Sequence, residues 1–323
     1  MLHRRPMVAA FLALIVLAGG TTTASGDRGR GDDGCEANAA ERLFTLQPDP
    51  AGNPEGVAFD KRSNAFFVSI TADGAIYRGT LGSDTVSPFI PGGEEREAIG
   101  LEIRRGKLYV AGGSTGSITV YDIASRQTLA TFETGPGGFL NDLVVTRRGD
   151  VFVTDSFRPR LWHVTAAQVR AGSGKPQALD VSEIPFEAGE FNLNGIVAKT
   201  SRKLVVVDSN GGALFRIDLA DDGSSIREID EIEGAVVPGG DGLLLDHGRL
   251  VVVQGDPAQL SFVNLHDGAR RATLERTQTS DKLRGPSTVD LANGLYLVVN
   301  ADFDTSRRPF TVAGLPRGEK HDD

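Results

Sequence analysis

Apolar and polar residues alternate along most of the chain in short runs that are typical of β-strands. One unit recurs: a polar residue, often followed by glycine, opens an apolar strand, and a turn leads into a second strand rich in Val, Leu and Phe. No segment keeps a helical apolar period across three turns, so the pattern predicts an all-β chain. The unit occurs six times, and its starts lie 42 to 53 residues apart. The starting residues are Glu55, Ile99, Asn141, Asn194, Asp241 and Ser287.

Repeats of about 40 to 50 residues that each hold four strands are typical of β-propeller blades. The sequence therefore predicts a six-bladed β-propeller with four-stranded antiparallel blades over residues 41–317. Because closing the ring removes exposed sheet edges, we expect the early strand that begins at Glu41 to complete the last blade beside the strand that begins at Pro309. An open sandwich of two sheets is the alternative fold.

The N-terminal segment has the pattern of a secretory signal peptide over residues 1–25: a short cationic start, an apolar run and small polar residues. The apolar run covers about 13 residues, fewer than the ~20 that cross a bilayer as a helix, and an uncleaved anchor is the alternative. We expect residues 26–40 to form a flexible linker and residues 318–323 a disordered tail. The chain is therefore predicted to be exported, without a membrane contact after signal removal. The lack of an Asn-x-Ser/Thr sequon favours a bacterial source.

The charge and the metal-binding residue types exclude several function classes. The formal net charge is −9, from 34 basic and 43 acidic residues, and no basic stripe occurs, which argues against nucleic acid as a partner. The single cysteine, Cys35, excludes an intramolecular disulfide and a zinc site built from cysteines. With only five histidines, a His-rich zinc, copper or iron site is not expected either. Among them, His163 and His247 are predicted to be surface or turn residues.

The six starting residues are predicted to form a ring, because the innermost strand of each propeller blade begins at one mouth of the central channel. Glu55, Asn141, Asn194 and Asp241 contribute two carboxylates and two amides to this ring. Hard oxygen ligands suit Ca²⁺, with Mg²⁺, Mn²⁺ or Zn²⁺ as alternatives. The two carboxylates would neutralise a divalent ion and would otherwise raise each other's pKa. The alternative is that each polar residue caps a strand end or bonds a neighbouring blade.

The motifs around these residues carry a resemblance to a known family. Pro-Glu55-Gly-Val, Leu-Asn194-Gly-Ile and Gly-Asp241-Gly-Leu resemble the three metal-ligand motifs of the senescence marker protein / gluconolactonase / luciferin-regenerating enzyme family. Phe-Leu-Asn141-Asp resembles its Arg-x-Asn-Asp-Gly motif, and the resemblance spans residues 41–316. It implies a six-bladed propeller that hydrolyses lactones or phosphoesters with a divalent cation, often Ca²⁺. It also implies that Glu55, Asn194 and Asp241 are metal ligands and that Asn141 contacts the substrate or metal-bound water.

The chain departs from the family at the expected substrate site. The family's substrate-binding arginine is Phe139 here, and Ile99 adds a second apolar residue to the predicted mouth. With Asn141, these two residues are the predicted substrate contacts, and they favour a hydrophobic or aromatic lactone or ester over a sugar lactone. Asp241 is the candidate general base, because a carboxylate at the ion can accept a proton from the attacking water.

Three functions follow from these residues. The first is a secreted, metal-dependent hydrolase of a lactone or related ester, which acts on a small molecule. The second is a non-catalytic propeller that binds a ligand or a protein and holds the ion for structure. The third is a propeller that catalyses a non-hydrolytic step on a small molecule. Away from the ring, Asp155 and Asp208 end the second strands of their repeats and are predicted to cap turns.

Overall fold

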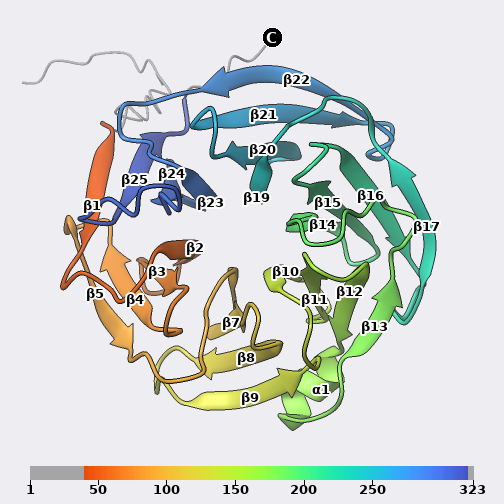
Figure 1. Cartoon of the computed structure of the whole chain (residues 1–323), viewed down its shortest axis with the longest axis horizontal. Coiled ribbons are helices and arrows are strands. Elements are labelled where there is room, and N and C mark those ends of the chain that lie inside the picture. Colours follow the sequence, from red (N-terminus) through yellow and green to blue (C-terminus); the bar gives the residue numbers. More distant parts are fainter. Residues whose placement is uncertain (1–39, 319–323) are drawn as a thin grey trace, which may run out of the picture. The chain divides into compact units, whose positions relative to one another are not determined.

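The computed structural model describes residues 40–318, and these residues form antiparallel sheets arranged around a common centre (Figure 1). Strands that follow one another in sequence pair as four-stranded meanders. The first consists of β2 (Pro54–Asp60), β3 (Ala65–Ile70), β4 (Ile76–Thr80) and β5 (Thr85–Ile90). The next consists of β6 (Leu101–Arg104), β7 (Lys107–Ala111), β8 (Ser117–Asp122) and β9 (Thr128–Glu133).

The same pattern continues along the chain. The following sheet comprises β10 (Leu140–Val145), β11 (Val151–Asp155), β12 (Arg160–Val164) and β13 (Gln177–Asp180). After it come β14 (Leu193–Thr200), β15 (Lys203–Asp208), β16 (Leu214–Leu219) and β17 (Ile226–Glu231). A further sheet holds β19 (Gly240–Asp246), β20 (Arg249–Gln254), β21 (Gln259–His266) and β22 (Arg271–Gln278), with the short β18 (Glu233–Gly234) parallel to β22.

The two ends of the described chain meet in one sheet. The C-terminal strands are β23 (Pro286–Ala292), β24 (Leu295–Asn300) and β25 (Thr311–Pro316). The N-terminal strand β1 (Arg42–Leu46) pairs antiparallel with β25, so that Leu43 lies opposite Ala313. β1 also pairs in parallel with β5 over a short stretch, which joins these strands and β2–β5 into one eight-stranded sheet.

The hydrophobic core lies between the faces of neighbouring sheets. Buried Phe152 and Leu161 of one sheet pack with Val206 and Phe215 of the next, and corresponding clusters recur along the chain. In each strand the side chains alternate between these two faces, which explains the short apolar runs of the sequence. The predicted all-β fold with repeated four-stranded sheets is confirmed.

The one helix in the described residues, α1 (Ala166–Ala171), begins at a capping box formed by Thr165 and Gln168. Among residues 40–318, no helix is long and apolar enough to cross a membrane. The predicted signal peptide lies outside the described residues, as do nearly all of the predicted linker and tail.

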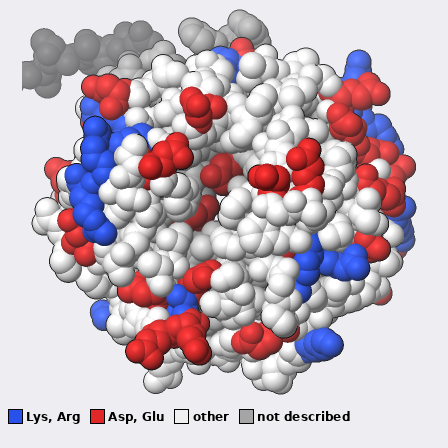
Figure 2. All heavy atoms as spheres, in the orientation of Figure 1, with Lys and Arg blue, Asp and Glu red and all other residues white. Residues whose placement is uncertain are grey.

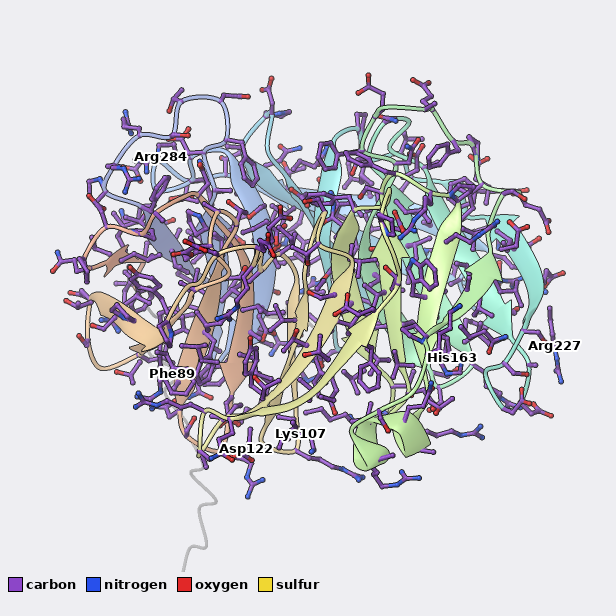
Figure 3. The ribbon with its side chains drawn as sticks, turned by 60° about the horizontal axis from the view of Figure 1, so that its bottom comes forward. Phe89, Lys107, Asp122, His163, Arg227 and Arg284 are labelled. Atoms are coloured by element: carbon purple, nitrogen blue, oxygen red, sulfur yellow. The ribbon has the colours of Figure 1, made fainter. Side chains whose placement is uncertain are left out.

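The prediction that His163 lies at the surface is wrong. His163 is 1% exposed on β12, and its ring stacks on that of Phe152 with the centroids 4.5 Å apart. Strand alternation places it on the same face as Leu161, so the imidazole fills part of the core between two sheets. Figure 3 shows His163 beside the strands, with α1 beyond their ends.

Candidate functional site

The predicted site residues line a single cavity of 670 Å³. Figure 2 shows a hollow at the centre of the described residues, with acidic side chains inside it. The cavity is lined by all the residues proposed from the sequence as metal ligands or substrate contacts, namely Glu55, Ile99, Phe139, Asn141, Asn194 and Asp241. Residues almost 190 positions apart in the chain therefore share one site.

Irregular strand pairing turns the polar residues toward this cavity. In β2 the ladder with β3 shifts between Pro54 and Val57, the interval that contains Glu55. The ladders of β14 and β19 shift in the same way around Asn194 and Asp241. A bulge changes the direction of the side chain within it and leaves local backbone groups unpaired. The same local irregularity therefore presents each of the three predicted metal ligands.

The glycine that follows each of these residues permits neighbouring inner strands to approach closely. A Cβ atom on Gly56 would lie 2.3 Å from the carbonyl oxygen of Ile99, and one on Gly195 would lie 2.3 Å from that of Asp241. Real Cβ contacts are not that short, so a side chain at either position would push the strands apart. The polar-glycine pairs in the sequence thus combine an inward-facing ligand with a tight contact between inner strands.

Ser287 does not line the cavity. Its side chain instead bonds to another inner strand, as the alternative interpretation of the ring predicts. It is buried, and its hydroxyl donates a 2.7 Å hydrogen bond to the carbonyl oxygen of Glu55 on β2. The next residue, Thr288, donates to Oε1 of Glu55 over 3.3 Å. Thr288 was not among the predicted residues, because its hydroxyl is one position away from the repeat start.

One side-chain oxygen of each predicted metal ligand has no hydrogen-bond partner. Within the described part of the chain, Oε2 of Glu55, Oδ1 of Asn194 and Oδ1 of Asp241 are all buried without a protein donor. A buried acceptor without a partner carries a desolvation cost of about 1–3 kcal/mol, and more if it is charged. Three such oxygens in one cavity fit a set of ligands for a cation.

The electrostatics of the cavity also favour a cation. Burial raises the pKa of Glu55 well above its usual value. The charges of Asp241 and Asp142 raise it further, whereas the hydrogen bond from Thr288 lowers it. Burial, together with the charge of Asp142, raises the pKa of Asp241 to about 8, although a hydrogen bond from Asn194 opposes the shift. Both carboxylates are therefore costly as isolated anions, and a bound cation would relieve that cost.

The amide of Asn141 is held in place beside these residues. Its Nδ2 donates to Oγ of Ser156 over 2.9 Å, and that hydroxyl donates to the carbonyl oxygen of Leu193 over 2.6 Å. Asn141 is thereby linked to the strand that carries Asn194. A fixed amide at the cavity wall can orient a substrate, which is the role predicted for it.

The predicted turn-capping roles of Asp155 and Asp208 are confirmed. Asp208 accepts hydrogen bonds from the backbone N–H groups of Asn210 and Gly211 at 3.3 and 3.0 Å. Asp155 accepts from the N–H groups of Phe157 and Arg158 at 3.2 and 3.1 Å. Both are buried at the ends of second strands, as the repeat position indicates.

The donor set differs from that of most transition-metal sites. Across residues 40–318, no group of three or more His, Cys, Asp or Glu side chains is placed to hold a metal ion. The predicted set has two carboxylates and an amide, so it depends on oxygen atoms and on further ligands from solvent or substrate. Such a set suits a hard cation such as Ca²⁺ better than zinc or copper.

Solved structures that match the chain at low identity show its fold. The chain is similar to a luciferin-regenerating enzyme at 13% identity and a TM-score of 0.63, covering 86% of this chain and 96% of that one. It is similar to a gluconolactonase of Xanthomonas campestris at 16% identity and a TM-score of 0.61, over 85% and 89% of the two chains. A virginiamycin B lyase from Staphylococcus aureus matches at 11% identity and a TM-score of 0.59, over 86% and 99%.

No protein-family model matches the chain, and no curated protein sequence matches it. At such low identities a structural likeness establishes the fold alone. Two of the matched structures carry names of the family that the motifs resemble. The roles of individual residues rest on the geometry of the cavity.

Proposed function

We propose that the chain is a six-bladed β-propeller that uses a divalent cation, most readily Ca²⁺, to hydrolyse a lactone or related ester. The pairing of β1 with β25 supports a ring closed by the N-terminal strand. The similarity to a gluconolactonase supports lactone chemistry on this fold. The signal-peptide pattern of residues 1–25 supports export.

The observation that carries the proposal is the set of three buried oxygens without partners. Oε2 of Glu55, Oδ1 of Asn194 and Oδ1 of Asp241 come from three different sheets and line one cavity. If these residues only capped strand ends or held sheets together, their oxygens would accept hydrogen bonds, as that of Asp208 does. Glu55, Asn194 and Asp241 would therefore hold the ion, which leaves Asn141 free for the substrate.

The chain's own residues would supply the remaining steps of hydrolysis. A bound divalent cation contributes a positive charge that polarises the substrate carbonyl. Asn141 orients that carbonyl, and Asp241 accepts the proton of the attacking water. The water oxygen bonds to the carbonyl carbon, and the carbon–oxygen bond of the ring then breaks. The proton leaves with the departing oxygen, and the product is a hydroxy acid.

The first test is a calcium titration of the mature protein by calorimetry. We expect one saturable site in the wild type and its loss in Glu55→Gln and in Asp241→Asn, because each removes a charge that the ion needs. Glu97→Gln is the matched control, because Glu97 lines the same cavity but both of its oxygens already accept hydrogen bonds from Ser114. A wild type that binds none of Ca²⁺, Mg²⁺, Mn²⁺ or Zn²⁺ would contradict the proposal.

The second test separates hydrolysis from the alternatives. The calcium-loaded protein is incubated with a panel of lactones and esters, and the products are analysed by mass spectrometry. Hydrolysis adds the mass of one water to a lactone, whereas an elimination opens the ring without adding it. The likeness to a virginiamycin B lyase makes this distinction necessary. Binding of the ion without any turnover would favour a non-catalytic binding protein.

A further inference from the structure

Three phenylalanines form a continuous aromatic surface beside the predicted metal ligands. The ring centroids of Phe139 and Phe157 are 5.5 Å apart, those of Phe139 and Phe191 are 5.1 Å apart, and those of Phe157 and Phe191 are 4.9 Å apart. Phe139 and Phe191 line the same 670 Å³ cavity as Glu55 and Asp241. We call Phe139, Phe157 and Phe191 the aromatic wall.

The aromatic wall is not part of the hydrophobic core. Phe157 is 37% exposed and Phe191 is 46% exposed, whereas most other phenylalanines in the described chain are fully buried. Phe303, which lines the cavity from the connection between β24 and β25, is 55% exposed. Large apolar side chains that remain exposed around one cavity indicate a binding surface.

Buried polar residues hold the aromatic wall in a fixed arrangement. Oδ1 of Asp155 accepts the backbone N–H of Phe139 at 3.0 Å and that of Phe157 at 3.2 Å, so one buried carboxylate positions two of the three rings. Asn192, which follows Phe191, is 1% exposed, and its Nδ2 donates to the carbonyl oxygen of Ser156 at 3.0 Å. Phe191 is thus linked through Asn192 to Ser156, the residue before Phe157. A rigid surface loses little entropy when it binds.

We propose that the aromatic wall binds an aryl group of the substrate, so that the ester or lactone acted on carries an aromatic ring. This inference rests on the proposed function, because it assigns the substrate of the same cavity. The aromatic wall has no side chain that can hydrogen-bond to sugar hydroxyls. The planes of its three rings meet pairwise at angles of 46° to 86°, in tilted and edge-to-face arrangements. Aromatic groups pack favourably against such edges and faces beyond the effect of burial.

The size and polarity of the cavity agree with such a substrate. A volume of 670 Å³ lies in the range of about 300–1,000 Å³ that suits small organic ligands. The unpartnered oxygens of Glu55 and Asp241 give the cavity a polar region, and Phe139 and Phe191 give it an apolar side. A substrate with a polar carbonyl and an aromatic substituent would match both parts.

Binding of lactams tests the inference without requiring turnover. The probes are three δ-lactams in the presence of Ca²⁺: unsubstituted, or with a phenyl or a cyclohexyl group next to the ring nitrogen. We expect the wild type to bind the phenyl lactam about tenfold more tightly than the unsubstituted one and several-fold more tightly than the cyclohexyl one. Equal affinity for the phenyl and cyclohexyl lactams, or no binding of any of them, would overturn the inference.

Variants of the wall provide the second arm of the test. Phe191→Ala should abolish most of the preference for phenyl, and Phe139→Leu should reduce it while keeping an apolar side chain at the position. Leu274→Ala is the control, since Leu274 is 50% exposed on β22 and does not line the cavity. A phenyl preference that survives in Phe191→Ala would contradict the inference.

The corresponding lactones separate this inference from the proposed function. The ratio of kcat/KM for the phenyl lactone to that for the unsubstituted lactone should fall about tenfold from wild type to Phe191→Ala. Comparing the two proteins cancels the difference in intrinsic reactivity between the lactones. Phenyl-selective binding of the lactams without hydrolysis of any lactone would contradict the proposed function and leave the aromatic site standing. Hydrolysis of the lactones without phenyl selectivity would support the proposed function and contradict the aromatic site.

Discussion

At the scale of single residues, Asp155 connects the stability of the chain to its candidate site. Its carboxylate is fully buried and accepts hydrogen bonds from three backbone N–H groups, from Nε of Arg158 and from Nε1 of Trp162. These partners include the backbones of two rings of the aromatic wall. Asp155 therefore positions part of the aromatic wall without lining the cavity itself.

Replacing Asp155 with asparagine should destabilise the protein by about 3 kcal/mol, because the amide nitrogen cannot accept the hydrogen bonds that now reach one carboxylate oxygen. Urea denaturation measures this change, and the emission of Trp162, the only tryptophan, reports the loss of its partner directly. The control is Asp122→Asn, a turn-capping aspartate at the exposed end of β8, for which little change is expected. Equal destabilisation by both changes would show that burial is not what makes Asp155 important.

At the scale of elements, the close contact between the inner strands β14 and β19 requires a glycine, Gly195. Gly195→Ala would place a Cβ atom 2.3 Å from the carbonyl oxygen of Asp241, so β14 and β19 must move apart. We expect a loss of stability of about 1–3 kcal/mol and weaker calcium binding, because Asn194 and Asp241 lie on those two strands. Thermal denaturation and calcium calorimetry test this prediction.

Gly82→Ala is the control for that change. The nearest atom to a Cβ on Gly82 is 3.9 Å away, and Gly82 lies in the turn after β4, so a small or slightly stabilising effect is expected. If Gly195→Ala left both the melting temperature and the calcium affinity unchanged, the close approach of the inner strands would not be what positions the two ligands.

The elements also explain which parts of the structure were predictable from the sequence. Strand alternation and turn residues repeat with every sheet, so the four-stranded pattern and the starts at Glu55, Asn194 and Asp241 were visible in the one-dimensional pattern. Phe139 was also predicted, but the other two rings of the aromatic wall were not, because Phe157 and Phe191 lie in connections outside the repeat. Thr288 and the buried His163 were missed for a related reason: each depends on which neighbouring strand its side chain meets.

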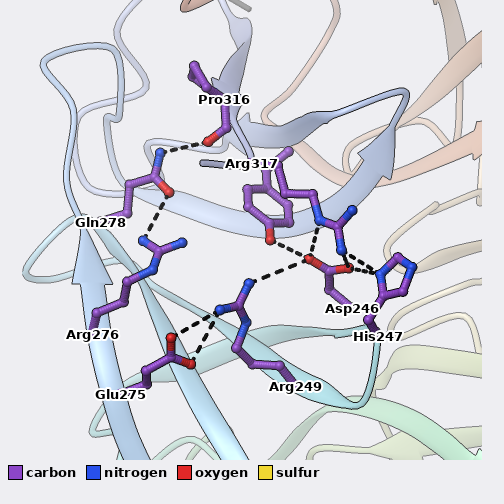
Figure 4. Close-up of polar contacts among 9 residues, drawn as sticks. Asp246, His247, Arg249, Glu275, Arg276, Gln278, Pro316 and Arg317 are labelled. Carbon is purple, nitrogen blue, oxygen red and sulfur yellow. Dashed lines mark hydrogen bonds and ion pairs between the residues drawn. The ribbon is translucent and has the colours of Figure 1, made fainter. Parts of the chain in front are cut away.

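At the scale of the whole molecule, charged networks join segments that are distant in sequence. Asp246, at the end of β19, accepts hydrogen bonds from Tyr296 at 2.6 Å and from Nε and Nη2 of Arg317 at 2.8 and 2.6 Å (Figure 4). Arg317 follows the last strand, β25, so this buried carboxylate fixes the end of the described chain against the neighbouring sheet. Hydrogen bonds from Tyr296, His247 and Arg317 outweigh burial, and the pKa of Asp246 lies below its usual value.

The half-buried carboxylate of Asp290 has the opposite shift and opposes folding at neutral pH. Burial raises the pKa of Asp290 to about 6, although the N–H groups of Phe59 and Leu291 donate to it at 2.6 and 2.7 Å. Because its folded-state pKa exceeds the unfolded value, folding favours the protonated form. Its contribution to stability is therefore fully present below about pH 4 and is lost as the pH rises through about 6.

The pH dependence of stability tests this assignment in the presence of a chelator, so that cation binding does not contribute. As the pH rises from about 4 to about 7, the wild type should lose up to about 3 kcal/mol of unfolding free energy relative to Asp290→Asn, which cannot ionise. The difference between the two proteins at each pH is the relevant quantity, because it cancels the titration of all shared groups and any constant cost of the substitution. Parallel profiles over this range would mean that the Asp290 carboxylate ionises without penalty, and that solvent reaches the strands β2 and β23 where Asp290 bonds to the neighbouring backbone.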